Sequence, residues 1–173
     1  MMKILIILVL FLASCKFAEK ETYILPKGFI GNVIIFTNIK NGDAKKYDEQ
    51  GRRLYIVKAS GLLLSRFRET YGVIDKRFVY GDQAEIYSEI KGVYFQYFSE
   101  SLDTQQVYAF YGRDATVEFP ESKDTVGVQV LTICKPRDFG HFKNDLFAKK
   151  ILEMNFLPQD LNYRILTELK NRK

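Results

Sequence analysis

Closely spaced turn signals divide the sequence between Thr22 and Cys134 into short apolar runs. Glycine, proline and asparagine separate these runs, and Asn41-Gly42 is the strongest single turn signal because both residues tolerate a positive φ. Short apolar or alternating runs bounded by such residues are typical of β-strands. Many short strands joined by frequent turns favour an antiparallel β-sandwich or an open barrel. The sequence therefore predicts a mainly β (α+β) fold.

One pair of runs predicts a hairpin. Arg52–Lys58 alternates in polarity, Ala59–Gly61 turns the chain, and Leu62–Ser65 returns. Further strands are expected at Val33–Phe36, Arg77–Tyr80, Val93–Phe98, Val107–Tyr111, Ala115–Phe119 and Val126–Cys134, with the last of these the longest. Gly112-Arg113-Asp114 is expected to be a turn between two of these strands.

The sequence period changes after Lys135-Pro136. From about residue 142 apolar side chains recur at helical spacing, and Leu157-Pro158 separates two helical runs. The second run carries one apolar stripe, from Leu161 to Leu169, which we expect to pack on the sheet. The sequence thus predicts one or two C-terminal helices within a single domain that spans residues 22–173.

The N-terminus has the pattern of a secretory signal peptide. A charged start at Lys3 precedes the apolar run Ile4–Leu12, and small residues follow it. This run is too short for a membrane-spanning helix, which needs about 20 residues. We therefore expect residues 1–14 to be a signal peptide and residues 15–21 to be a tether. An uncleaved short anchor and a secreted product without lipid are the alternatives.

Leu12-Ala13-Ser14-Cys15 resembles the lipobox of bacterial lipoproteins. The resemblance implies that the sulfur of Cys15 receives a diacylglycerol, and that its amino group is acylated after cleavage. The lipid bilayer would then be a partner, because two acyl chains hold a protein stably at a membrane. Lys16 differs from the aspartate that often retains lipoproteins at the inner membrane, which favours an outer membrane where the host has two.

A second resemblance covers roughly residues 22–80. Thr22–Val33, with Gly51–Ile56 and Ser60–Leu64, resembles a family of small bacterial lipoproteins of unknown function. In that family a Tyr-x-(Ile/Leu)-Pro-x-Gly-(aromatic)-x-Gly-x-Val segment follows the lipidated cysteine closely. The resemblance implies a β-rich envelope domain and no particular activity.

The sequence predicts no catalytic residue, metal site or cofactor. It holds one histidine, His141, and one cysteine besides Cys15, whereas a zinc site needs three or four such ligands. No Gly-x-Ser-x-Gly segment is present. We expect His141 at a helix start or on the surface and Cys134 as a small buried apolar residue. Asp114 and the other acidic residues of the middle segment include no pair that spacing singles out.

These observations lead to three function hypotheses. The first is a non-catalytic envelope lipoprotein that binds or scaffolds an envelope protein or glycan. The second is a small-ligand carrier with a cavity lined by the aromatic residues from Phe78 to Tyr111, although core packing also explains those residues. The third is a small hydrolase that uses carboxylates. No recognition motif for nucleic acid is present, so nucleic-acid binding is not expected.

Overall fold

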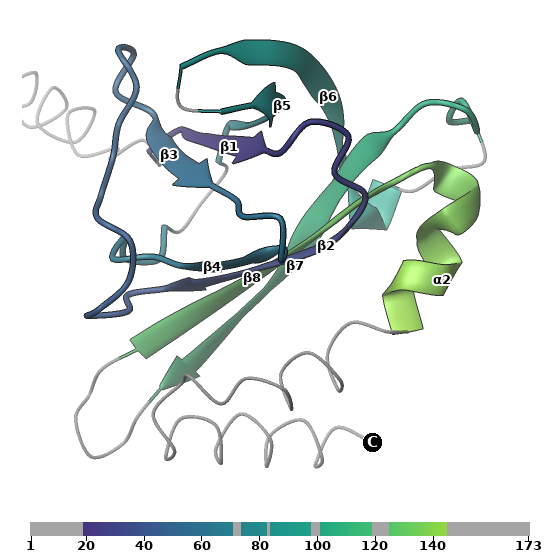
Figure 1. Cartoon of the computed structure of the whole chain (residues 1–173). Coiled ribbons are helices and arrows are strands. Elements are labelled where there is room, and N and C mark those ends of the chain that lie inside the picture. Colours follow the sequence, from purple (N-terminus) through teal and green to yellow (C-terminus); the bar gives the residue numbers. More distant parts are fainter. Residues whose placement is uncertain (1–18, 71–73, 83, 98–100, 119–124, 145–173) are drawn as a thin grey trace, which may run out of the picture.

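The structure is a computed structural model that describes residues 19–70, 74–82, 84–97, 101–118 and 125–144 (Figure 1). In these ranges, eight strands form one sheet in the order β3-β1-β5-β6-β7-β8-β2-β4. The strands are β1 (Glu21–Leu25), β2 (Gly31–Thr37), β3 (Arg53–Ile56), β4 (Leu62–Leu64), β5 (Lys76–Gly81), β6 (Ile86–Tyr94), β7 (Tyr108–Glu118) and β8 (Thr125–Cys134). The short helical elements are η1 (Phe95–Tyr97), η2 (Pro136–Asp138) and α2 (Phe139–Asn144).

The sheet curls into a nearly closed barrel (Figure 1). Residues of its two edge strands, β3 and β4, line the same cleft. A hydrogen bond across the interior shows the curvature. The Tyr23 hydroxyl on β1 lies 2.8 Å from Oε1 of Gln129 on β8, although β5, β6 and β7 separate these strands in the sheet. The mainly β fold class is confirmed, and of the two architectures expected the open barrel is the one observed.

Strand pairing is mixed, which differs from the antiparallel sheet expected. β1 pairs in parallel with both β3 and β5, β2 with β4, and β6 with β7. The pairs β5–β6, β7–β8 and β2–β8 are antiparallel. A tight turn can join only antiparallel neighbours. Because β1 and β2 follow each other along the chain without pairing, each is left to accept a parallel partner from later in the sequence.

The expected hairpin of Arg52–Lys58 with Leu62–Ser65 is wrong, although the turn between its arms is present. The Gly61 amide donates to the Lys58 carbonyl, as a turn requires. The two arms nevertheless separate, because each pairs with another strand. The Val57 amide donates to the Ile24 carbonyl beyond β3, and the Ile34 amide donates to the Gly61 carbonyl before β4. These contacts place the arms at opposite ends of the strand order.

Two further expectations are corrected by the paths of β6 and β7. The run Val93–Phe98 is not a strand of its own, because β6 ends at Tyr94 and η1 follows. Gly112-Arg113-Asp114 is not a turn, because β7 continues through it as one strand of 11 residues, one more than β8. The pairing register with β8 shifts between Phe110 and Arg113. The extra residue is therefore absorbed by a β-bulge, so β8 is not the longest strand.

Aromatic and aliphatic side chains fill the interior. The Tyr23 ring stacks between those of Tyr55 and Phe78, each with a centroid distance of 5.0 Å. The principal core consists of Tyr23, Leu25, Val33, Ile35, Tyr55, Val57, Leu63, Phe67, Phe78, Ile90, Ala109, Leu131 and Ile133. Along β2 and β8 nearly every residue is buried, so both faces of these two strands are covered. A continuous apolar run is the pattern that such strands require.

A smaller cluster lies under α2 at the end of β8. Cys134 is fully buried there beside Phe110 and Phe139, as expected for a small apolar residue, and it forms no disulfide. The helical segment expected from about residue 142 begins with α2, which starts three residues earlier, at Phe139. Its continuation beyond residue 144, the stripe from Leu161 to Leu169, the signal peptide and Cys15 lie outside the described residues. None of the helices in the described ranges has the length and hydropathy of a membrane span.

Candidate functional site

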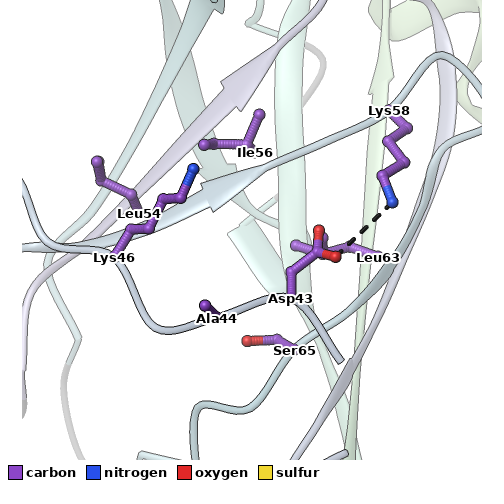
Figure 2. A pocket seen from close by; sticks show the side chains of 8 residues that line it. All are labelled: Asp43, Ala44, Lys46, Leu54, Ile56, Lys58, Leu63 and Ser65. Carbon is purple, nitrogen blue, oxygen red and sulfur yellow. Dashed lines mark ion pairs between the residues drawn. The ribbon is translucent and has the colours of Figure 1, made fainter. Parts of the chain in front are cut away.

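An accessible cleft opens in the barrel wall between the two edge strands, and we call it the wall cleft. Its volume is about 430 Å³. Strand β3 provides one side and β4 the other, while the turn that begins at Lys58 joins them at one end. The lining residues are Asp43, Ala44, Lys46, Leu54, Ile56, Lys58, Leu63 and Ser65 (Figure 2). Ligand-binding pockets commonly range from about 300 to 1,000 Å³, so a compact group fits here.

The remaining side of the wall cleft is formed by the segment Asp43–Tyr47, which precedes both edge strands in the sequence. In space it extends from the end of β4 to the start of β3. The Asp43 amide donates to the Leu64 carbonyl at 2.7 Å, and the Leu54 amide donates to the Lys46 carbonyl at 2.9 Å. Gly42 permits this approach, because a Cβ atom there would lie 2.8 Å from the Leu64 backbone. The chain itself therefore occupies part of the gap between the two sheet edges.

The wall cleft has an apolar bed and a charged rim. Leu54 and Ile56 are half-buried, whereas Leu63 is buried beneath them. Figure 2 shows Lys46 and Lys58 on opposite sides of the opening, with Asp43 between them. Lys58 Nζ lies 3.8 Å from Asp43 Oδ1, and both side chains are more than half exposed. The ion pair is thus an open one, which solvent and a ligand can both reach.

A second group of polar residues comprises Glu21, Tyr23, Lys76 and Gln129 in the barrel interior and Asp114 at its margin, where the Asp114 side chain is 41% exposed; we call it the interior polar cluster. Lys76 Nζ lies 3.8 Å from Glu21 Oε2 and 3.6 Å from Asp114 Oδ2. It also lies 5.7 Å from the Tyr23 ring centroid, within cation–π range. The Lys76 side chain is only 3% exposed and forms no hydrogen bond to any described residue. The ammonium is therefore held by charge and by ring contact.

The Tyr23 hydroxyl contacts two oxygen atoms of this cluster. It lies 2.5 Å from Glu21 Oε2 and 2.8 Å from Gln129 Oε1, and it has one proton to donate. Both contacts are satisfied if Glu21 is protonated and donates to the Tyr23 oxygen while Tyr23 donates to Gln129. They are also satisfied if the Gln129 amide takes its other orientation, so that its nitrogen donates to the Tyr23 oxygen while Tyr23 donates to Glu21. Burial raises the pKa of Glu21 above its ordinary value, although Lys76 opposes this shift. Burial likewise raises the pKa of Asp114 and the pKa of Tyr23.

The bulge in β7 places Asp114 on the face of the strand that meets Lys76. Side chains alternate between the two faces of a strand, so an inserted residue exchanges the faces of all later positions. Beyond the register shift Asp114 lies opposite Gln129, whose side chain is buried in the interior. Gly112 adopts a φ of 101°, and a Cβ atom there would lie 2.3 Å from the Tyr94 ring. Glycine therefore suits both the bulge and its packing.

The two groups differ in what they can do chemically. Glu21 is fully buried, so a substrate cannot reach its carboxyl group. The ion pair of Glu21 with Lys76 is thus enclosed, whereas the wall cleft is accessible to a ligand. In the described ranges no group of three or more metal-ligating side chains is placed to hold a metal ion.

The single histidine and the described cysteine do not join either group. His141 is exposed on α2, in agreement with the surface position expected for it. Burial raises the pKa of the Cys134 thiol to about 12, so this residue stays protonated at neutral pH. A protonated thiol is a poor nucleophile, which agrees with a packing role.

Sequence reasoning did not identify the residues of the wall cleft. Leu54, Ile56 and Leu63 were interpretable only as strand residues, and Asp43 only as part of the turn that Asn41-Gly42 begins. The turn itself is confirmed, since the Gly42 amide donates to the Ile39 carbonyl. Among the aromatic residues from Phe78 to Tyr111, Tyr87 is 45% exposed, and Lys27 Nζ lies 5.7 Å from its ring centroid. Phe78 belongs to the principal core, and Tyr111 packs against that core with its ring centroid 5.5 Å from that of Phe78. The packing of these two rings is what the core interpretation predicts.

The fold and the wall cleft define a small open-barrel domain with an accessible wall pocket. The chain belongs to a family of unknown function (DUF6843), whose pattern matches residues 18–127. The match includes all of β1 to β7 and begins shortly after Cys15. It extends beyond the region of roughly residues 22–80 in which a family resemblance was expected.

Comparison with solved structures gives a distant match to a 2.75 Å crystal structure described as that of a "Putative Lipoprotein from Bacillus anthracis". The two chains are 9% identical, with a TM-score of 0.47, and the match covers 66% of this chain and 69% of the other. No curated protein sequence matches the chain.

Proposed function

We propose that the chain is a lipid-anchored protein of the bacterial cell envelope whose β domain binds another envelope component without catalysing a reaction. The wall cleft is the observation that carries the binding role. It is accessible, it has an apolar bed, and it is built on strands whose positions the barrel determines. Binding sites on rigid elements are well suited to selective contacts, because little order must be gained on binding.

The sequence supports the anchor. Cys15 stands where a lipobox places the acylated cysteine, and Glu19 is the first described residue after it. Four residues span at most about 14 Å when fully extended. An acylated Cys15 would therefore keep the start of β1 close to the bilayer, and it would keep the wall cleft near components of the membrane surface.

The anchor is tested by labelling cells with radioactive palmitate. Cys15→Ser should abolish incorporation and release the protein from the membrane fraction. Cys134→Ala is the matched control, because it removes the other cysteine and should leave the label unchanged. Equal labelling of the wild type and the Cys15→Ser variant would contradict the proposed anchor.

The binding role is tested by site-specific photo-cross-linking in the native envelope. A benzophenone side chain at Lys45, an exposed neighbour of the wall cleft that does not line it, should give a discrete cross-linked product without filling the wall cleft. The same group at Lys91, an exposed residue on β6, should not give that product. Identical products from both positions, or none from Lys45, would contradict a binding role for the wall cleft.

A further inference from the structure

We infer that the wall cleft binds a compact aliphatic group that carries one negative charge. This inference rests on the proposed function and specifies the chemistry of the ligand. A short-chain carboxylic acid and the C-terminal aliphatic residue of a polypeptide share this chemistry.

The apolar bed of the wall cleft favours an aliphatic group in the ligand. Leu54, Ile56 and Leu63 converge on the wall cleft from the two edge strands, and the small side chain of Ala44 leaves the space between them open (Figure 2). Leu54 and Ile56 are only half-buried, although they lie on strand β3 of the barrel. A ligand would remove more of their apolar surface from water, which favours binding.

The charged rim of the wall cleft favours a negative charge on the ligand. Among the described residues that line the opening, Lys46 and Lys58 are basic and Asp43 is acidic, so together they carry one net positive charge. The ion pair between Lys58 and Asp43 has an N–O distance of 3.8 Å and is exposed, so it is weak. A carboxylate placed between the two lysines would replace water as the acceptor of hydrogen bonds from their ammonium groups.

The shape requires a compact group. Two sheet edges that line one gap could in principle accept an added strand. Here the segment Asp43–Tyr47 already hydrogen-bonds to both edges, through the Asp43 amide on one side and the Lys46 carbonyl on the other. The turn at Lys58 closes the opposite end. A continuous peptide strand therefore has no path through the wall cleft, whereas the end of a chain or a small molecule can enter it.

The test is methyl NMR of the whole chain, with labelled leucine and isoleucine methyl groups, in phosphatidylcholine nanodiscs. Hexanoate should shift the methyl signals of Leu54, Ile56 and Leu63 in a saturable manner. Hexylamine, which has the same alkyl chain and the opposite charge, should bind at least about tenfold more weakly. Equal binding of the two probes, or no saturable shift with hexanoate or the peptide below, would overturn the inference.

Three variants assign the effect to the wall cleft. Ala44→Phe should fill the space and abolish the hexanoate shifts. Lys46→Glu should weaken binding about tenfold, because it reverses one charge at the rim. Lys45→Glu is the matched control: it makes the same change at an exposed neighbour that does not line the wall cleft, and it should alter binding less than twofold. Equal effects of the Lys46 and Lys45 variants would overturn the assignment.

A peptide arm distinguishes the two sources of the ligand. Acetyl-Ala-Leu with a free C-terminus is compared with the same peptide amidated. Tighter binding of the free peptide than of hexanoate would identify a polypeptide terminus as the source, and the reverse order would identify a free acid. Equal binding of the free and amidated peptides would overturn the need for a negative charge. Equal palmitate labelling of the wild type and the Cys15→Ser variant would instead overturn only the proposed anchor, so the two failures are distinguishable.

Discussion

The interior polar cluster and the wall cleft both contain a lysine beside a carboxylate, yet the two ion pairs have opposite surroundings. Lys76 is 3% exposed and Glu21 is fully buried, whereas Lys58 is 67% exposed and Asp43 is 53% exposed. Removing one partner from a buried pair leaves the other charge in a medium that cannot solvate it. Removing one partner from an exposed pair leaves the other charge solvated by water. The same two residue types thus serve stability inside the barrel and remain available for binding at its wall.

The largest effect is expected from Lys76→Met, which keeps the length of the side chain and removes its charge. Glu21 and Asp114 would lose their common counter-ion, so the free energy of unfolding should fall by about 3 kcal/mol. Lys58→Met is the matched control at the wall cleft and should stay within about 0.5 kcal/mol of wild type. Urea unfolding followed by circular dichroism measures both values, and equal losses would remove the distinction between the two sites.

A smaller effect is expected from Gly112→Ala, which acts on the bulge that places Asp114 beside Lys76. The residue would be held at a φ of 101° with its Cβ atom against the Tyr94 ring, so we expect a loss of about 2 kcal/mol. Gly51→Ala is the control, because Gly51 also has a positive φ but has open space around it. Its loss should be about 1 kcal/mol. A Gly112→Ala variant no less stable than Gly51→Ala would contradict the packing argument.

Tyr23→Phe should cost about 1 kcal/mol. The substitution keeps the stacked ring and removes the hydroxyl that contacts Glu21 and Gln129, which leaves buried polar atoms without a partner. Tyr47→Phe, at a ring that is 49% exposed, should leave the urea midpoint unchanged. An unchanged midpoint for Tyr23→Phe as well would mean that the hydroxyl contributes nothing to the interior polar cluster.

The smallest effect is a change in how stability depends on pH. Because the pKa of Glu21 is raised on folding, its contribution to stability is complete below its ordinary pKa and is lost as pH rises through the folded-state pKa. Glu21→Gln should therefore gain stability relative to wild type between pH 5 and about pH 8. Comparison of urea midpoints at both pH values tests this sign.

Asp75 provides the opposite case for this pH experiment. A hydrogen bond from Arg52 holds the pKa of Asp75 below its ordinary value, so its contribution is present at neutral pH and is lost as pH falls through the folded-state pKa. Asp75→Asn should therefore be less stable than wild type at neutral pH, and this difference should shrink on acidification. Slopes of the same sign for the two variants would contradict the assignment of either shift.

Much of the fold could be predicted from local sequence. The runs at Val33–Phe36 and Val126–Cys134 are strands, and Asn41-Gly42 is a turn, because these depend on the preferences of neighbouring residues. Strand partners could not be predicted in the same way. Leu62–Leu64 follows a turn and fits a hairpin equally well, and only its pairing with β2 decides that it forms the far edge of the sheet.

The candidate sites show the same limit more strongly. Nothing near Glu21 in the sequence indicates a partner, because Lys76 and Asp114 arrive on later strands. In the sequence Asp114 is one acidic residue among several, and only the bulge near Gly112 places it beside Lys76. The wall cleft had no local signal either, since its lining comes from a turn and two strands whose separation depends on the whole barrel.

By itself, the sequence determined the strand-rich character of this protein and the presence of a cysteine in a lipobox-like setting, because both depend on residues that are adjacent in the chain. Only the tertiary structure decided which strands form the edges, which lysine is buried and which is exposed, and where the wall opens. The physical reason is that burial and pairing are properties of residues brought together over long stretches of chain, and closing the barrel selects among them.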